Sequence, residues 1–169
     1  TEIKDEYNEG NSLTYGLSIS ELQSLGYIDA NGNLTSQHDA ATVNWGDDWR
    51  MPTESEMQEL LDNCTWERTV QNDVGGYKVT SKVNSNSIFL PGAGYRNGSS
   101  LTFAGVTGNY LSSIPLGDND FAYQLYFSSS SQRVNGYYRE LGQSVRPVSG
   151  GNIEEPETTT AHCKKNQLR

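Results

Sequence analysis

The clearest structural signal in this chain is the stretch Trp49-Arg-Met-Pro-Thr-Glu-Ser-Glu-Met-Gln-Glu-Leu-Leu61. The Thr53 hydroxyl can accept a hydrogen bond from the Glu56 N–H, and the Glu56 carboxylate can accept one from the Thr53 N–H, which forms the capping box of a helix N-terminus. The apolar side chains that follow share one face of such a helix, namely Met57, Leu60 and Leu61. The stretch therefore predicts a helix over 54–62.

Two weaker helix signals precede this stretch. The segment 18–25 contains leucines three residues apart and is followed by Gly26, a common C-terminal stop. Another helix is expected to begin at Ser36, where Asp39 supplies a second capping group, and to end at Gly46.

Beyond Cys64 the apolar residues recur with a period of two, which is typical of strands. Short strands are expected at 65–70, 76–81, 87–90, 109–113, 121–127, 132–134 with 137–138, and 144–148. Helices followed by a run of short strands predict an α+β domain in which helices pack against antiparallel sheet.

The expected strand 121–127 illustrates the alternation of side chains between two faces. One face would carry Phe121, Tyr123, Leu125 and Phe127, and the other Ala122, Gln124 and Tyr126. We expect one face to lie in the core and the other to face water.

Composition excludes several classes of protein. The 169 residues correspond to about one domain, and with 34% hydrophobic residues the sequence contains no apolar run near the ~18 residues of a membrane span. A net charge of −9 with 12 scattered Lys and Arg argues against nucleic acid as a partner. We expect an N-terminal segment 1–33 without a visible signal peptide, a folded domain 34–148 and a flexible polar tail 149–169.

Residues for catalysis or metal binding are sparse. The histidines are His38, in an expected helix, and His162, in the tail, so no base is placed to activate a nucleophile. Cys64 and Cys163 lack the spacing of a zinc site, and a disulfide between them would require the tail to return to the core. The sequence predicts no cofactor and no enzyme activity.

Two acidic stretches leave alternatives open. Asp47-Asp48 lies between Trp45 and Trp49, as a carbohydrate cleft would require, but a helix-terminal turn with both Trp rings packed on the core also explains it. Gly117-Asp-Asn-Asp120 offers oxygen ligands for calcium, although an ordinary turn has the same composition.

A tyrosine-rich region points to binding. Six of the 10 tyrosines lie between Tyr95 and Tyr138, among many Ser, Asn and Gly residues. Tyr provides rigid amphipathic contact area and Ser, Asn and Gly provide adaptable hydrogen bonds, as in antibody-type binding surfaces.

Several motifs, taken in order, resemble a known family. They are Asp39-Ala-Ala-Thr-Val-Asn-Trp-Gly46, Trp49-Arg-Met-Pro-Thr53, Glu59-Leu-Leu-Asp-Asn-Cys-Thr-Trp66, Gly76-Tyr-Lys-Val-Thr-Ser81, Ser87-Ile-Phe-Leu-Pro91, Gly94-Tyr-Arg96 and Ser144-Val-Arg-Pro-Val148. Over residues 34–148 the chain resembles the Fibrobacter succinogenes major paralogous (FISUMP) domain family, which is common in surface proteins of gut Bacteroidetes. The resemblance implies a C-type-lectin-like fold, with two main helices (37–45 and 54–62) packed on a small twisted antiparallel sheet.

This family is close to the variable proteins that retroelements diversify in bacteria and phages. In those proteins the C-terminal part of the domain contacts ligand, which here corresponds to residues 95–143. The resemblance implies these contact residues: Tyr110, Asp118, Asn119, Asp120, Gln124, Tyr126, Asn135, Tyr137, Tyr138, Glu140, Leu141 and Gln143. The positions implied as scaffold are Trp45, Trp49, Arg50, Pro52, Gly94, Arg146 and Pro147.

The resulting expectation is a non-catalytic, surface-exposed domain that binds a protein or glycan, on a cell surface or on a phage virion. Two alternatives are a structural or pilus-like subunit and a calcium-dependent lectin that uses Asp118 and Asp120. Sulfatase activation, known among formylglycine-generating relatives, is not expected because Cys64 and Cys163 match neither the context nor the spacing of the paired cysteines of those enzymes.

Overall fold

The computed structural model describes residues 4–117 and 120–150, and within them the chain is mostly β. Strand accounts for 42% and helix for 17%, in small antiparallel sheets with three short α-helices. The predicted α+β, C-type-lectin-like architecture with two main helices packed on one sheet is therefore wrong. No helix in these two ranges has the length and apolar character needed to cross a membrane.

The helices confirm the strongest local signal and shorten a weaker one. A 3-10 turn, Glu9–Asn11, precedes α1 (Ile19–Ser24), α2 (Ala40–Trp45) and α3 (Glu54–Asn63). The capping box of α3 is present, because Thr53 Oγ1 accepts from Glu56 N and Glu56 Oε2 accepts from Thr53 N. α2 begins after Asp39 rather than at Ser36, since the Asp39 carboxylate accepts the free Ala41 and Thr42 N–H groups.

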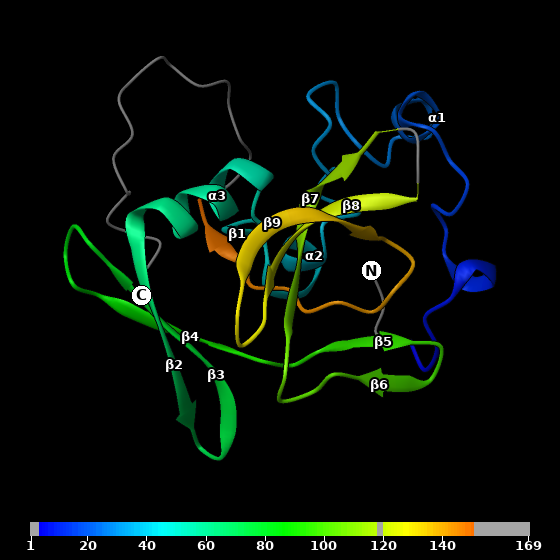
Figure 1. The fold of residues 1–169 in the computed structure, drawn as a ribbon. Coiled ribbons are helices and arrows are strands. Elements are labelled where there is room, and N and C mark those ends of the chain that lie inside the picture. The colour runs from blue at the N-terminus through cyan, green and yellow to red at the C-terminus, as the bar shows by residue number, and fades with distance from the viewer. Residues whose placement is uncertain (1–3, 118–119, 151–169) are drawn as a thin grey trace.

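Ten strands form four antiparallel sheets (Figure 1). The strands are β1 (Trp49–Arg50), β2 (Cys64–Gln71), β3 (Val74–Ser81), β4 (Ser87–Pro91), β5 (Tyr95–Asn97), β6 (Ser100–Thr102), β7 (Gly108–Leu116), β8 (Phe121–Phe127), β9 (Gln132–Tyr138) and β10 (Val148–Ser149). The pairs and sheets are β1–β10, β2–β3–β4, β5–β6 and β7–β8–β9. The predicted strand 144–148 is reduced to a bridge between Ser144 and Tyr110 and the short β10.

The core lies where α3 meets the two three-stranded sheets. Its buried residues are Met57, Cys64, Tyr77, Val79, Leu90, Tyr110, Leu125 and Phe127. The Phe127 ring occupies the centre, with ring centroids 5.2 Å from Tyr77 and 5.9 Å from Tyr110. Gly108 has no side chain at the point where the Phe127 ring passes, since a Cβ there would come within 2.1 Å of it. This packing makes the β7–β8–β9 sheet a rigid platform.

The two faces of β8 do not separate into core and water as predicted. Leu125 and Phe127 face the core, but Ala122 and Gln124 on the opposite face are also buried, and Gln124 is only 1% exposed. The opposite face is therefore covered near its centre, and its exposed side chains lie around that centre.

Candidate ligand-binding surface

The structure divides the predicted contact residues into three groups. Tyr110, Gln124 and Leu141 are buried. Tyr138 is exposed and the others are half-buried, namely Asp120, Tyr126, Asn135, Tyr137, Glu140 and Gln143. Asp118 and Asn119 lie outside the described residues.

The three buried residues were wrongly assigned as solvent-facing contacts. Tyr110 packs with Leu125 in the core, its hydroxyl donates to the Pro91 carbonyl at 2.8 Å, and burial raises its pKa. Leu141 packs in the turn after β9. Their side chains stabilise the sheet, and Gln124 does so through hydrogen bonds.

Gln124 is the centre of a row of buried amides that we call the amide ladder: Thr107, Asn109, Gln124 and Asn135. Thr107 Oγ1 donates to Asn109 Oδ1 at 3.0 Å, and Asn109 Nδ2 donates to Gln124 Oε1 at 2.9 Å. Gln124 Nε2 then donates to Asn135 Oδ1 at 3.4 Å, and Asn135 Nδ2 donates to the Gly136 carbonyl at 2.9 Å. The ladder thus crosses β7, β8 and β9 and fixes the orientation of polar groups that are costly to bury alone.

Aromatic rings surround the ladder on the same face of the sheet. In the β8–β9 register Tyr126 pairs with Arg133, Gln124 with Asn135 and Ala122 with Tyr137, so these side chains project to one side. We call the exposed and half-buried members, with two rings from the β5–β6 region, the tyrosine surface: Tyr95, Phe103, Tyr126, Arg133, Asn135, Tyr137 and Tyr138.

The rings of the tyrosine surface contact one another. The Tyr137 ring centroid lies 5.5 Å from Tyr95 and 5.7 Å from Tyr138, and Tyr95 lies 6.2 Å from Phe103. The Arg133 guanidinium sits 4.4 Å from the Tyr126 ring centroid, a cation–π contact. Phe103 and Tyr138 are 56% and 45% exposed, so the row of rings remains open to a partner.

The electrostatics of this surface favour neutral hydroxyl groups and one cation. Burial, followed by the hydrogen bond with Tyr95, raises the pKa of Tyr137 to about 12. Its hydroxyl therefore stays protonated at neutral pH and can donate a hydrogen bond to a ligand.

The acidic end of the predicted site has a structural role instead. The Asp120 carboxylate accepts a hydrogen bond from the Gly16 N–H at 2.5 Å and lies 3.7 Å from Arg139 Nη2. Arg139 Nη2 also donates to the carbonyls of Thr14 and Leu17, so this cluster fastens the N-terminal segment to β8. Burial raises the pKa of the neighbouring Glu140. In the ranges that the structure describes, no three His, Cys, Asp or Glu residues are grouped as metal ligands, and Asp118 lies outside those ranges.

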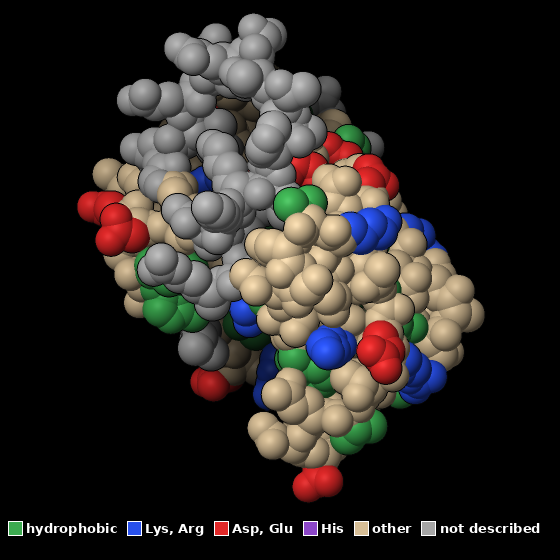
Figure 2. Space-filling view, turned by 90° about the vertical axis from the view of Figure 1, so that its left-hand side faces the viewer, with side chains coloured by type: hydrophobic (Ala, Val, Ile, Leu, Met, Phe, Trp, Pro, Cys, Tyr) green, Lys and Arg blue, Asp and Glu red, His purple; other side chains and the backbone are tan. Residues whose placement is uncertain are grey.

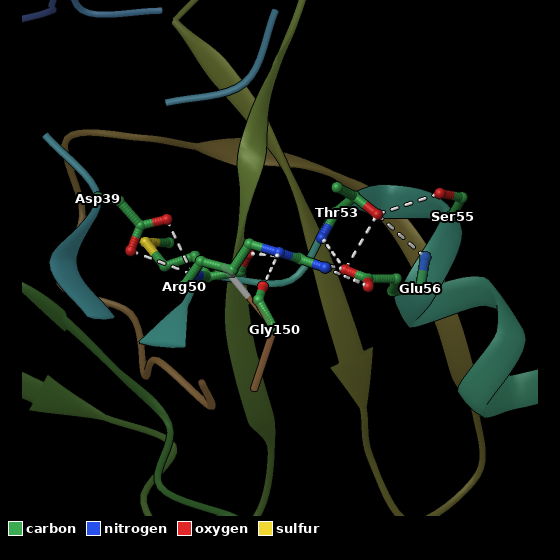
Figure 3. A network of polar contacts seen from close by, with 7 residues as sticks. Asp39, Arg50, Thr53, Ser55, Glu56 and Gly150 are labelled. Carbon is green, nitrogen blue, oxygen red and sulfur yellow. Dashed lines mark hydrogen bonds and ion pairs between the residues drawn. The ribbon is translucent and has the colours of Figure 1, made fainter. Parts of the chain in front are cut away.

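A second polar cluster lies between α2 and α3, and we call it the Arg50 network: Asp39, Arg50, Met51, Thr53, Glu56 and Gly150 (Figure 3). Arg50 Nη1 and Nη2 donate to the two Glu56 carboxylate oxygens at 2.7 and 2.6 Å, and Arg50 Nε donates to the Gly150 carbonyl. Burial raises the pKa of Glu56, but the hydrogen bonds from Arg50 and Thr53 outweigh burial and leave the pKa below its usual value. The network joins the start of α3 to the end of the domain.

The positions implied as scaffold are only partly buried. Pro52 is buried, and Gly94 has φ +64° with a Cβ position 2.0 Å from the Thr102 carbonyl oxygen, so a side chain cannot fit there. Trp45 is 54% exposed and Trp49 is also exposed. The prediction that both Trp rings pack on the core is therefore wrong.

Sequence reasoning missed Tyr95, Phe103 and Arg133 as individual members of the surface. A signal for two of them was present, because Asn97-Gly98 is a strong hairpin turn and Gly98 adopts φ +58°. That turn pairs Tyr95 with Thr102 and leads directly to Phe103. No local signal places Arg133 over Tyr126, since that contact depends on the β8–β9 register.

The view in Figure 2 shows a contrasting side of the molecule. Its basic and acidic side chains are interspersed, and hydrophobic side chains form small separate areas. His38, one of the residues considered for catalysis, bonds Thr35 Oγ1 through Nδ1 and packs against the Tyr27 ring. Comparisons with protein-family models, curated proteins and solved structures found no match to this chain.

Proposed function

We propose that this domain is a non-catalytic binding module, displayed at a cell surface, that contacts a protein or glycan ligand through the tyrosine surface. The observation that carries the proposal is the row of contacting, partly exposed rings Tyr95, Phe103, Tyr137 and Tyr138 on a sheet whose opposite face is packed in the core.

The physical argument concerns preorganisation. Tyr and Arg are the residues that most often dominate binding energy, because each buries a large rigid area and retains a polar group. Here the rings are restrained by one another and by the strands, so less side-chain entropy is lost on binding. The amide ladder beneath them keeps the sheet from shifting.

The resemblance to the FISUMP family and to retroelement-diversified proteins supports the same proposal. In this reading the variable part of the domain includes β8 and β9 and the turn after them. A gene for a reverse transcriptase with a near-identical template repeat next to this coding sequence would support diversification, and a neighbourhood without one would contradict it.

The test begins with ligand identification on a glycan microarray and in a display library of extracellular proteins. The combined substitution Tyr126→Ala, Tyr137→Ala and Tyr138→Ala is then compared with a control that removes exposed apolar groups elsewhere, Val70→Ala, Val74→Ala and Val83→Ala. We expect the tyrosine substitutions to weaken binding by about a hundredfold or more and the valine substitutions to leave it unchanged. Equal affinities for both variants, with the fold intact, would contradict the proposal.

A further inference from the structure

A small cavity lies beside the tyrosine surface, between β5 and the turn after β9. It has a volume of about 200 Å³, and its side-chain lining comes from Tyr7, Tyr95, Arg96, Leu101, Gln143 and Ser144. Pockets that enclose a whole small-molecule ligand usually measure about 300–1,000 Å³. This cavity is therefore sized for one group of a larger ligand.

The walls of the cavity are fixed by backbone hydrogen bonds from three parts of the chain. Arg96 and Gly142 exchange two N–H···O bonds of 2.8 and 3.0 Å, and Tyr7 and Gly98 exchange two of 3.0 and 2.7 Å. The Tyr7 ring packs directly on Gly142, where a Cβ would come within 2.8 Å of the ring. These bonds do not involve the Arg96 and Gln143 side chains, so the side chains can be changed without removing the walls.

The lining offers one cation and no carboxylate. The printed sequence contains no Asp or Glu between Val74 and Gly117 or between Phe121 and Arg139, although the whole chain carries a charge of −9. In the described residues Arg96 makes one side-chain hydrogen bond, from Nη1 to the Ser99 carbonyl at 3.2 Å, and no ion pair. Its remaining donors suit a carboxylate, which a guanidinium binds with two parallel hydrogen bonds.

Gln143 adds a complementary acceptor. Its Nε2 donates to the Tyr138 carbonyl at 3.1 Å, and its Oε1 is buried without a hydrogen-bond partner among the described residues. A buried acceptor left unpaired is costly, and a backbone N–H from a bound peptide would satisfy it.

From these observations we infer that the cavity binds the carboxylate side chain of an Asp or Glu in a protein ligand that extends across the tyrosine surface. This inference rests on the proposed function. The Arg96 guanidinium binds the carboxylate, the Gln143 amide oxygen accepts a peptide N–H, and the Tyr95 ring belongs to both the cavity and the tyrosine surface. The volume for a single side chain favours a protein ligand over an acidic glycan.

The experiment uses the full chain labelled with 15N and three probes in NMR titrations. The probes are N-acetyl-glutamate N-methylamide, its neutral isostere N-acetyl-glutamine N-methylamide, and methyl sialoside. We expect the glutamate probe to cause saturable shifts in the amide signals of 94–96 and 142–144 and to bind at least about tenfold more tightly than the glutamine probe.

Two variants separate the cavity from general charge effects. Arg96→Gln should weaken the glutamate probe about tenfold or more while the rest of the spectrum stays folded. Arg133→Gln is the matched control, because Arg133 is also exposed and also has no acidic partner among the described residues, but it lies outside the cavity. Its affinity for the glutamate probe should be unchanged.

The inference is overturned if no probe gives saturable shifts at these signals, if the glutamate and glutamine probes bind equally, or if Arg96→Gln has no effect. Tighter binding of the sialoside at the same signals would also overturn it, in favour of an acidic glycan. These results are independent of the tyrosine substitutions, so failure of the cavity inference can be told apart from failure of the proposed function.

Discussion

The Arg50 network and the tyrosine surface are both held by buried hydrogen bonds, but they use them differently. In the Arg50 network the charged groups bond one another, as Arg50 does with Glu56 and as Asp39 does with the Met51 N–H. In the β7–β8–β9 sheet the buried bonds are between neutral amides, and the groups at the outer face remain exposed. The comparison suggests that charge pairing serves the stability of the domain, whereas neutral ladders support a face that is left open for contact.

The largest effect is expected from Asp39→Ala, which tests how much stability the Arg50 network provides. The buried Asp39 carboxylate accepts hydrogen bonds from the Ala41, Thr42 and Met51 N–H groups, and alanine would leave all of them unpaired. We expect a loss of about 4 kcal/mol in the free energy of unfolding, measured by urea denaturation. Asp39→Asn, which keeps one acceptor oxygen, should lose clearly less, and equal losses would argue against this role.

The next largest effect is expected from Gln124→Leu, which breaks the amide ladder without changing the tyrosine surface. Asn109 Nδ2 and Asn135 Oδ1 would lose their buried partner. Unfolding should become easier by about 3 kcal/mol. A variant as stable as the parent chain would show that the ladder contributes nothing to the platform.

A smaller effect separates the two regions by pH on the acid side. The pKa of Glu56 is lowered in the folded state, so its contribution to stability is present above the usual carboxylate pKa and is lost as the pH falls through the lowered value. Arg50→Gln should remove about 2 kcal/mol at pH 7 and reduce the decline in stability on acidification. An unchanged slope of stability against pH between about 3 and 5 would contradict this assignment.

The smallest effect lies on the alkaline side and belongs to the tyrosine surface. The pKa of Tyr137 is raised to about 12 by burial and by its hydrogen bond with Tyr95. Its contribution is fully present below about pH 10, the unfolded value, and is lost as the pH rises toward 12. Tyr137→Phe should make stability less dependent on pH above 10, and ultraviolet titration should show one fewer late-ionising tyrosine.

Local signals in the sequence were sufficient for part of this fold. The capping box of Thr53 and Glu56 predicted α3 within one residue, and the alternation of 121–127 predicted β8 with its observed bounds. Such features depend on residues that are close in sequence, so they can be read without knowing the tertiary structure.

The arrangement of these elements could not be predicted in the same way. Asp39 replaces Ser36 as the cap of α2 because its carboxylate also binds Met51, twelve residues away. Gln124 has the polarity of a surface residue but is buried, because Asn109 and Asn135 come from neighbouring strands to pair with it. The expectation of a C-type-lectin-like fold failed at this level, where several small sheets rather than two helices organise the chain.

The same limit applies to the binding surface. Tyr126, Tyr137 and Tyr138 were predicted from composition and resemblance and do reach the surface, whereas Tyr110 has the same side chain but faces the core. The strand register decides between these outcomes, since Tyr110 pairs with Leu125 and Tyr126 pairs with Arg133 on opposite faces.

Hydrogen–deuterium exchange with and without an identified ligand compares the two regions most directly. If the tyrosine surface is the contact face, bound ligand should slow backbone exchange in 95–103 and 126–138 and leave 39–63 unchanged. Protection confined to 39–63, around the Arg50 network and the exposed Trp45, would contradict the account.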